Sequence, residues 1–196
     1  KLSTLGDQIT DWLDNSRIQE PVRNKLNEWL KGDLKDWDIS RDNPYFGFKI
    51  PGYENKYFYV WLDAPIGYLA SHLNYLKKNK LESDFEKIWN KDSSTEVFHF
   101  IGKDIMYFHT LFFPVMLKNS ALKTPNGVFV HGFLTLNGEK MSKSRGNFIS
   151  AQNYIETLEP DYLRYFFASK LGTGVDDVDL NLEDFKQKNN ADLVNK

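Results

Sequence analysis

The segment with the strongest chemical signature is a lysine-rich loop, residues 140–145, with the sequence KMSKSR. Three cations and two serines fall within its six residues, between the turn formers Asn137-Gly138 and Gly146. A flexible loop of this kind can close on a polyphosphate, where ammonium groups stabilise the charge that develops during transfer. An isolated K-x-x-K segment, in contrast, is usually a solvated surface loop.

Two further segments combine aromatic residues with strand-to-helix corners. Residues 61–68 (WLDAPIGY) carry a tryptophan and a tyrosine on either side of a proline, which suits a narrow apolar pocket. Residues 102–109 (GKDIMYFH) follow the next predicted strand, and Ile105 and His109 would share one face of a helix. Core packing is the ordinary alternative for both segments.

The elements predicted to position these segments alternate between strand and helix. Short apolar runs predict buried strands, and helical periodicity appears between them. This alternation indicates an α/β fold of parallel βαβ units, in which ligands bind at the carboxyl ends of the strands. The predicted strands are 56–63, 96–102 and 127–136, and the predicted helices are 66–78, 84–90 and 105–118.

Both flanks of this region are predicted to be mainly helical. Residues 3–31 contain two helical patterns, and 36–53 form a connecting segment with short strands. Residues after 146 are mostly helical as well. The expected boundaries are Pro21 and Gly32 for the second helix, a break at 158–161, and Asn181 as the cap of the last helix.

Composition narrows the class of protein. The chain has 196 residues, 41% of them hydrophobic, which is enough for a core and argues against disorder. The net charge of −2 provides no bulk basic field for nucleic acid, so RNA binding would need a local patch or a segment outside the chain. No apolar run approaches the roughly 20 residues of a membrane span, and no signal sequence is present, so a cytoplasmic protein is expected.

No metal site is predicted within the chain. It has no cysteine, which excludes a thiolate zinc site. Asp177-x-Asp179-x-Asn181 imitates the start of a calcium loop, but Leu182 replaces the required glycine and Lys188 the required glutamate. We interpret this segment as a loop and helix cap.

These segments together resemble one enzyme family. The KMSKS loop resembles the lysine signature of class I aminoacyl-tRNA synthetases, and 61–68 and 102–109 resemble segments of methionyl-tRNA synthetases. The resemblance covers nearly the whole chain. It implies the second half of a Rossmann-like catalytic domain followed by a mostly helical stem-contact region. The implied segments are the end of the connective insertion (1–35), the second half of the catalytic fold (36–149), the stem-contact region (150–180) and the start of the anticodon-binding helical domain (181–196).

The resemblance also implies the site residues. Those expected to bind methionine are Trp61, Ala64, Pro65, Tyr68, Asp104, Ile105 and His109. Those expected to bind ATP are Gly102, His131, Leu134, Lys140, Ser142 and Lys143, of which Lys140 and Lys143 are the catalytic cations.

Four other positions are interpreted more narrowly. Arg41 either orients phosphates or forms a structural salt bridge, and the sequence leaves both open. His72 and His99 are expected to have surface or core roles. Phe113 stands where bacterial relatives often carry tryptophan, so it is expected to reshape the back of the methionine pocket.

The implied activity is the ATP- and Mg²⁺-dependent conversion of methionine to methionyl-adenylate, followed by transfer to initiator and elongator tRNA(Met). The chain lacks a His-x-Gly-His motif, which in this family holds ATP from the first half of the fold. It also lacks the zinc knuckle, so zinc is possible only elsewhere in a parent enzyme. Both ends of the chain are expected to be cuts. The isolated chain is therefore expected to be inactive, with tRNA contacts mainly outside it and the oligomeric state open.

Two alternatives remain at this stage. A synthetase for another large aliphatic amino acid would share the lysine loop, although Ala64–Tyr68 favours methionine. A panel of amino acids in exchange assays would show which amino acid is the substrate.

A non-catalytic RNA-binding or interaction module is the other alternative. The intact lysine loop argues against it, whereas ATP binding that survives Lys143→Ala would favour it.

Overall fold

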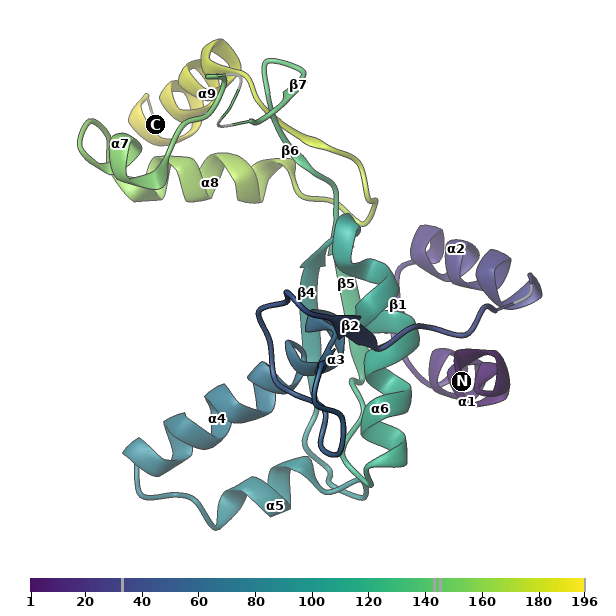
Figure 1. Cartoon of the computed structure of the whole chain (residues 1–196). Coiled ribbons are helices and arrows are strands. Elements are labelled where there is room, and N and C mark those ends of the chain that lie inside the picture. The colour runs from purple at the N-terminus through teal and green to yellow at the C-terminus, as the bar shows by residue number, and fades with distance from the viewer. Residues whose placement is uncertain (33, 143, 145, 196) are drawn as a thin grey trace. The chain divides into compact units, whose positions relative to one another are not determined.

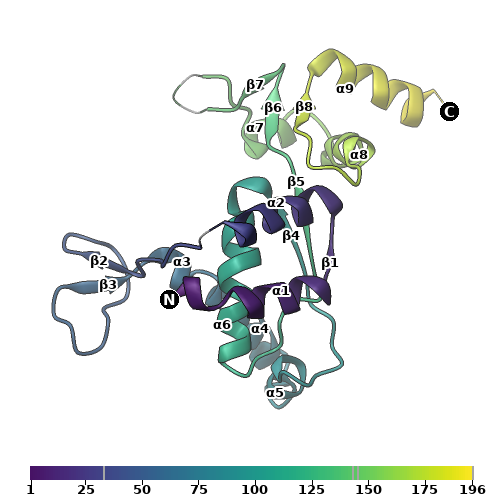
Figure 2. The same cartoon turned by 90° about the vertical axis from the view of Figure 1, so that its right-hand side faces the viewer.

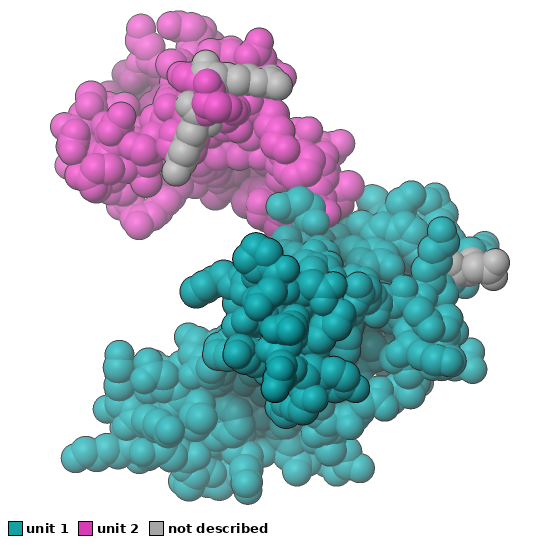
Figure 3. Space-filling view, in the orientation of Figure 1, with its two compact units in different colours: residues 1–99, 104–129 teal, residues 100–103, 130–196 magenta. Residues whose placement is uncertain are grey.

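The structure is a computed structural model, and it describes residues 1–32, 34–142, 144 and 146–195. The chain divides into two compact units, which Figure 3 shows in teal and magenta. Unit 1 comprises residues 1–99 and 104–129, and unit 2 comprises residues 100–103 and 130–196.

Unit 1 begins with two helices, as predicted. A 3₁₀ turn (Leu2–Thr4) leads into α1 (Gly6–Asp14), and α2 (Glu20–Lys31) follows. Pro21 lies in the first turn of α2, where its missing N–H interrupts no helical hydrogen bond. Gly32 ends the helix. The buried apolar side chains of the two helices are Ile9, Trp12, Leu13, Val22 and Leu26.

A three-stranded sheet has the strand order β1 (Arg17–Ile18), β5 (Gly127–His131) and β4 (Phe98–Gly102). Strand β1 runs parallel to β5, as expected for this fold. Strand β4 confirms the predicted strand 96–102, and β5 confirms the first half of the predicted strand 127–136. The two-residue strand β1 is not predicted from the sequence, because it is too short to show a periodicity.

The three predicted helices of unit 1 are present: α4 (Ile66–Lys78), α5 (Asp84–Trp89) and α6 (Phe113–Asn119). Figures 1 and 2 show α6 alongside strands β4 and β5. One core cluster joins the three helices through Leu69, Trp89, Phe113 and Leu117. The start of the last predicted helix differs, because a 3₁₀ turn (Lys103–Ile105) and a π-helix (Phe108–Phe112) precede α6.

The predicted strand 56–63 is wrong in its second half. Strand β3 (Lys56–Phe58) ends early and pairs antiparallel with β2 (Ser40–Asp42), forming an arm that extends from the helices of unit 1 (Figure 2). The next residues form a short helix, α3 (Val60–Asp63). Periodicity does not distinguish a strand from a buried helical turn in so short an apolar run.

Unit 2 has its own three-stranded sheet, in which β6 (Leu134–Leu136) pairs antiparallel with β7 (Glu139–Lys140) and parallel with β8 (Val178–Leu180). The predicted strand 127–136 is therefore interrupted at residues 132–133, and β8 is not predicted.

Apart from loops, the other elements described in unit 2 are helices. The helices are α7 (Ala151–Ile155), α8 (Pro160–Lys170), α9 (Leu182–Asn189) and a π-helical turn (Asn190–Val194). The predicted break at 158–161 and the Asn181 cap are confirmed, since the Asn181 side chain accepts a hydrogen bond from the Asp184 amide. The four implied segments are defined by resemblance, whereas the units are defined by contacts, so the segments stay a prediction.

Candidate active site

His109 lies at the centre of a cluster of aromatic rings in unit 1, with 1% of its surface exposed. Its Nδ1 is 2.9 Å from the Ile105 carbonyl oxygen, and its Nε2 is 2.9 Å from the Tyr68 hydroxyl. A carbonyl oxygen can only accept, so Nδ1 carries the proton. In the neutral ring, Nε2 then accepts the hydrogen bond that the Tyr68 hydroxyl donates.

The protonation states of these groups follow from their burial. Burial lowers the pKa of His109, and the hydrogen bond to the Ile105 carbonyl only partly opposes this effect. Burial also raises the pKa of the Tyr68 hydroxyl. The imidazole and the phenol are therefore neutral near pH 7, and in these states the Tyr68 hydroxyl donates to Nε2 of His109.

His99 belongs to the same cluster, although the sequence assigned it no functional role. Its ring centroid lies 5.5 Å from that of His109 and 4.9 Å from that of Tyr68. Burial, and secondarily the neighbouring His109, lower the pKa of His99 to about 4. Its Nε2 is buried and has no hydrogen-bond partner. His72, in contrast, accepts a hydrogen bond from the Trp89 indole, in agreement with a structural role.

Trp61 and Phe113 complete the ring cluster. Trp61, on α3, stacks on Phe108 with ring centroids 4.0 Å apart, and its centroid is 6.1 Å from that of His109. Phe113 is buried, with its centroid 5.9 Å from that of Tyr68. The structure thus brings together four of the predicted methionine residues: Trp61, Tyr68, Ile105 and His109.

The other three predicted methionine residues lie in the segments that join or precede the helices of this cluster. Ala64 and Pro65 connect α3 to α4, with Ala64 exposed and Pro65 buried. Asp104 is exposed on the 3₁₀ turn that precedes the π-helix. π-helical turns occur frequently at functional sites.

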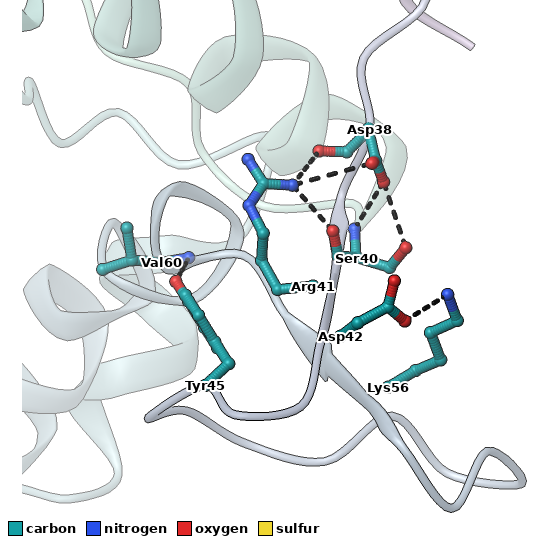
Figure 4. Close-up of polar contacts among 7 residues, drawn as sticks. All are labelled: Asp38, Ser40, Arg41, Asp42, Tyr45, Lys56 and Val60. Carbon is teal, nitrogen blue, oxygen red and sulfur yellow. Dashed lines mark hydrogen bonds and ion pairs between the residues drawn. The ribbon is translucent and has the colours of Figure 1, made fainter.

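Arg41 is held by its own segment, as Figure 4 shows. Its Nη1 donates to the Ser40 carbonyl (2.6 Å) and the Asp38 carbonyl (3.2 Å), and it lies 3.7 Å from the Asp38 carboxylate. Its guanidinium carbon is 3.8 Å from the centroid of the Tyr59 ring. These contacts support the structural alternative for Arg41.

The lysine loop of unit 2 follows a tight hairpin. Asn137 (φ 51°) and Gly138 (φ 81°) connect β6 to β7, and positive φ at both positions is what a two-residue hairpin turn requires. The predicted Asn-Gly turn is confirmed. Asp179 stabilises it, since Oδ1 accepts from the Thr135 hydroxyl (2.6 Å) and the Gly138 amide (2.7 Å).

Asn147 joins the two ends of the lysine loop. Its Oδ1 accepts from the Ser142 amide (3.0 Å), and its Nδ2 donates to the Lys140 carbonyl (3.1 Å). The hydroxyls of Ser142 and Ser144 are 3.0 Å apart. Lys143, the expected main phosphate contact, lies outside the described residues.

The remaining predicted ATP residues also belong to unit 2. Gly102 ends β4, His131 ends β5 and is exposed, and Leu134 begins β6 with 39% of its surface exposed. His131 donates from Nδ1 to the Gly132 carbonyl at 2.7 Å. The predicted ATP residues therefore fall in unit 2, and the predicted methionine residues fall in unit 1.

Three other observations bear on ligands. A cavity of about 600 Å³ lies among α7, α8 and α9, but none of the predicted site residues lines it. Within the described part of the chain, no three histidine or acidic side chains are placed to hold a metal ion. In the same described residues, no helix combines the length and apolar character needed to cross a bilayer.

A parallel sheet covered by helices and followed by a lysine-rich loop is the arrangement expected from the resemblance to class I aminoacyl-tRNA synthetases. The model of the family described as tRNA synthetases class I (M) matches residues 1–196, and the chain belongs to this family.

The chain is also similar in structure to one solved member of this family. The methionyl-tRNA synthetase of Mycobacterium tuberculosis in complex with methionyl-adenylate is 31% identical, with a TM-score of 0.81 over 99% of this chain and 37% of that chain. A second structure bound by methionyl-adenylate is 30% identical, with a TM-score of 0.81 over 100% and 37% of the two chains. The apo form is 27% identical, with a TM-score of 0.75 over 100% and 36%. The chain thus spans little more than a third of the length of these relatives.

Proposed function

We propose that this chain forms the second half of the catalytic domain of a methionyl-tRNA synthetase. The observation that carries the proposal is the hydrogen-bonded arrangement of the Ile105 carbonyl, the buried and neutral His109, and Tyr68, which is 42% exposed. An uncharged thioether side chain suits a neutral site lined by aromatic rings, because its polarisable sulfur packs favourably against them. The related structures that hold methionyl-adenylate support the same assignment.

The proposed reaction has two steps. The methionine carboxylate attacks the α-phosphorus of ATP, so methionyl-adenylate forms and pyrophosphate leaves. A terminal ribose hydroxyl of tRNA(Met), initiator or elongator, then attacks the acyl carbon, and AMP leaves. No protein nucleophile is needed, so positioning and charge stabilisation provide the catalysis.

Each group of residues has a separate task in this reaction. Trp61, Ala64, Pro65, Tyr68, Ile105 and His109 select methionine, and Asp104 faces its ammonium group or a ribose hydroxyl. Gly102, His131, Leu134 and Ser142 contact ATP. Lys140 and Lys143 stabilise the charge on the phosphates, and Mg²⁺, bound with ATP, assists them.

Replacement of Tyr68 in the whole protein that carries this sequence tests the proposal. Tyr68→Phe leaves the buried Nε2 of His109 without its donor, which costs about 1–3 kcal/mol. We expect kcat/KM for methionine to fall about five- to 150-fold in ATP–pyrophosphate exchange. Tyr75→Phe is the matched control, because Tyr75 lies on the same helix α4 and is 60% exposed.

The outcomes separate methionine from other substrates. Unmodified protein should prefer methionine in a panel that includes leucine, isoleucine and valine. Exchange that depends on another of these amino acids, or equal behaviour of Tyr68→Phe and Tyr75→Phe, would contradict the proposal.

A further inference from the structure

We propose that Lys103 is a positioning residue for the lysine loop, because its ion pair with Asp177 holds Phe133, whose ring in turn holds the ammonium of Lys140. All four residues belong to unit 2. The proposal rests on the proposed function, in which Lys140 contacts the phosphates of ATP.

One carboxylate oxygen begins this chain of contacts. Asp177 Oδ1 lies 2.6 Å from Lys103 Nζ and also accepts a hydrogen bond from the Phe133 amide at 2.7 Å. The Lys103 ammonium is 4.5 Å from the centroid of the Phe133 ring, and the Lys140 ammonium is 5.1 Å from the same centroid. The ring therefore contacts Lys103, which directly follows β4, and Lys140, the first residue of the lysine loop.

The backbone of Phe133 is fixed on both sides. Its amide donates to Asp177, and its carbonyl accepts from the Val178 amide at 2.8 Å. The preceding residue, Gly132, approaches so closely that a Cβ there would lie 2.0 Å from the Asp176 carbonyl oxygen. The segment that carries Phe133 is thus tightly joined to the segment that carries Asp177.

The charges in this group allow Lys140 to be positioned and still remain available to bind a phosphate. The ion pair with Lys103, and the hydrogen bond from the Phe133 amide, lower the pKa of Asp177, so its carboxylate stays ionised at neutral pH. Asp177 offsets the charge of Lys103. Lys140 is held by the face of an aromatic ring, which attracts a cation weakly enough for a phosphate to compete.

Tryptic cleavage after Lys140 in the 196-residue chain measures this positioning without any activity. Lys103→Met removes the charge that pairs with Asp177. We expect cleavage at the Lys140–Met141 bond to become about two- to five-fold faster, the factor that corresponds to the free energy of one exposed cation–π contact. Lys103→Arg should restore the original rate. Phe133→Leu should act like Lys103→Met, and Phe133→Tyr should not.

Lys170→Met is the matched control. Lys170 also pairs with an aspartate, Asp184, and its ammonium lies 5.2 Å from the centroid of the Phe166 ring in the same unit. If Lys103→Met and Lys170→Met change cleavage after Lys140 equally, the proposal is wrong.

Exchange assays on the whole protein supply a second measurement. Lys103→Met should raise KM for ATP about two- to five-fold and leave KM for methionine unchanged, because the methionine residues belong to unit 1. A general loss of structure would change both constants, and this would contradict a positioning role. Absence of exchange in the unmodified protein would instead reject the proposed function, while the cleavage experiment would still decide the role of Lys103.

Discussion

Tyr68, His99 and His109 form a group whose members depend on one another's protonation state. A proton added to His109 Nε2 would face the donor hydroxyl of Tyr68 and remove the acceptor that this hydroxyl uses. The same proton would also place a positive charge close to His99, because the centroids of the His99 and His109 rings are 5.5 Å apart. Burial and the proximity of the two imidazoles therefore favour the neutral state of both rings over the charged one.

This dependence predicts that acid destabilises unit 1 above the range where carboxylates titrate. An unfolded histidine titrates near 6.5, whereas the pKa of folded His99 is about 4, so the stabilisation is complete above 6.5 and is lost as the pH falls toward 4. We expect a loss of about 2 kcal/mol between pH 6.5 and pH 5 from His99. Tryptophan fluorescence in urea titrations measures it, since all five tryptophans lie in unit 1.

Two variants show whether His99 is the cause. His99→Gln should flatten the dependence of the unfolding free energy on pH, because the titrating group is gone. His131→Gln should not, because His131 is exposed and belongs to unit 2. An unchanged slope in His99→Gln would show that another group is responsible.

At the scale of elements, the junction between β5 and β6 depends on a residue without a side chain. A Cβ at Gly132 would lie 2.0 Å from the Asp176 carbonyl oxygen and 2.3 Å from its carbon. Because the obstructing atoms are backbone, Gly132→Ala must displace the segment that leads into β8. We expect a loss of about 2 kcal/mol or more of stability in unit 2.

Amide hydrogen exchange measures this loss directly, because it reports on unit 2 without a tryptophan. The amides of Phe133 and Val178 should lose protection in Gly132→Ala, since both donate hydrogen bonds across this junction. Gly172→Ala is the control, because a Cβ there would meet no atom within 4 Å. Equal protection in the two variants would show that the junction tolerates the displacement.

The same elements show which parts of the fold are predictable. Helix α4 and the Asn137-Gly138 turn follow from periodicity and local turn chemistry, and both are present as predicted. Strands β1 and β8 have two and three residues and exist through pairing with β5 and β6, which no local pattern encodes. Helix α3 comes from an apolar run that suits a strand equally well.

In the candidate site too, some residues are predictable from the sequence and others depend on contacts that only the fold creates. The cluster of Trp61, Tyr68, Ile105 and His109 follows from resemblance to known synthetases, and the structure brings together three of these side chains and the Ile105 carbonyl. The contributions of His99, Asp177, Asp179 and Asn147 depend on contacts between segments far apart in the chain. For Asp177 and Asp179, the sequence offered only a false likeness to a calcium loop.

At the scale of the whole molecule, the sheet and arm of the chain expose apolar surface. Strand β4 is at one side of the described sheet, and Phe100 on it is 77% exposed. Phe46 and Phe48, between β2 and β3, are 102% and 71% exposed. Exposed strands and large apolar side chains usually mark surfaces that other protein segments cover. The related synthetases are nearly three times as long, so they have chain available for this purpose.

These observations lead to the prediction that the 196-residue chain alone does not catalyse methionine-dependent pyrophosphate exchange. In the proposed reaction, Lys140 and Lys143 contact the phosphates, and the chain has no His-x-Gly-His motif, which the resemblance implies as their partner. Loss of a single transition-state donor already costs about 100-fold or more. Exchange should therefore lie at least that far below the rate of the whole protein, at saturating ATP and methionine. The whole protein assayed in parallel is the control for the assay, and circular dichroism checks that the chain is folded. Exchange at a comparable rate from the folded chain would show that its own residues suffice for adenylate formation, because positioning and charge would then need no first half of the catalytic domain.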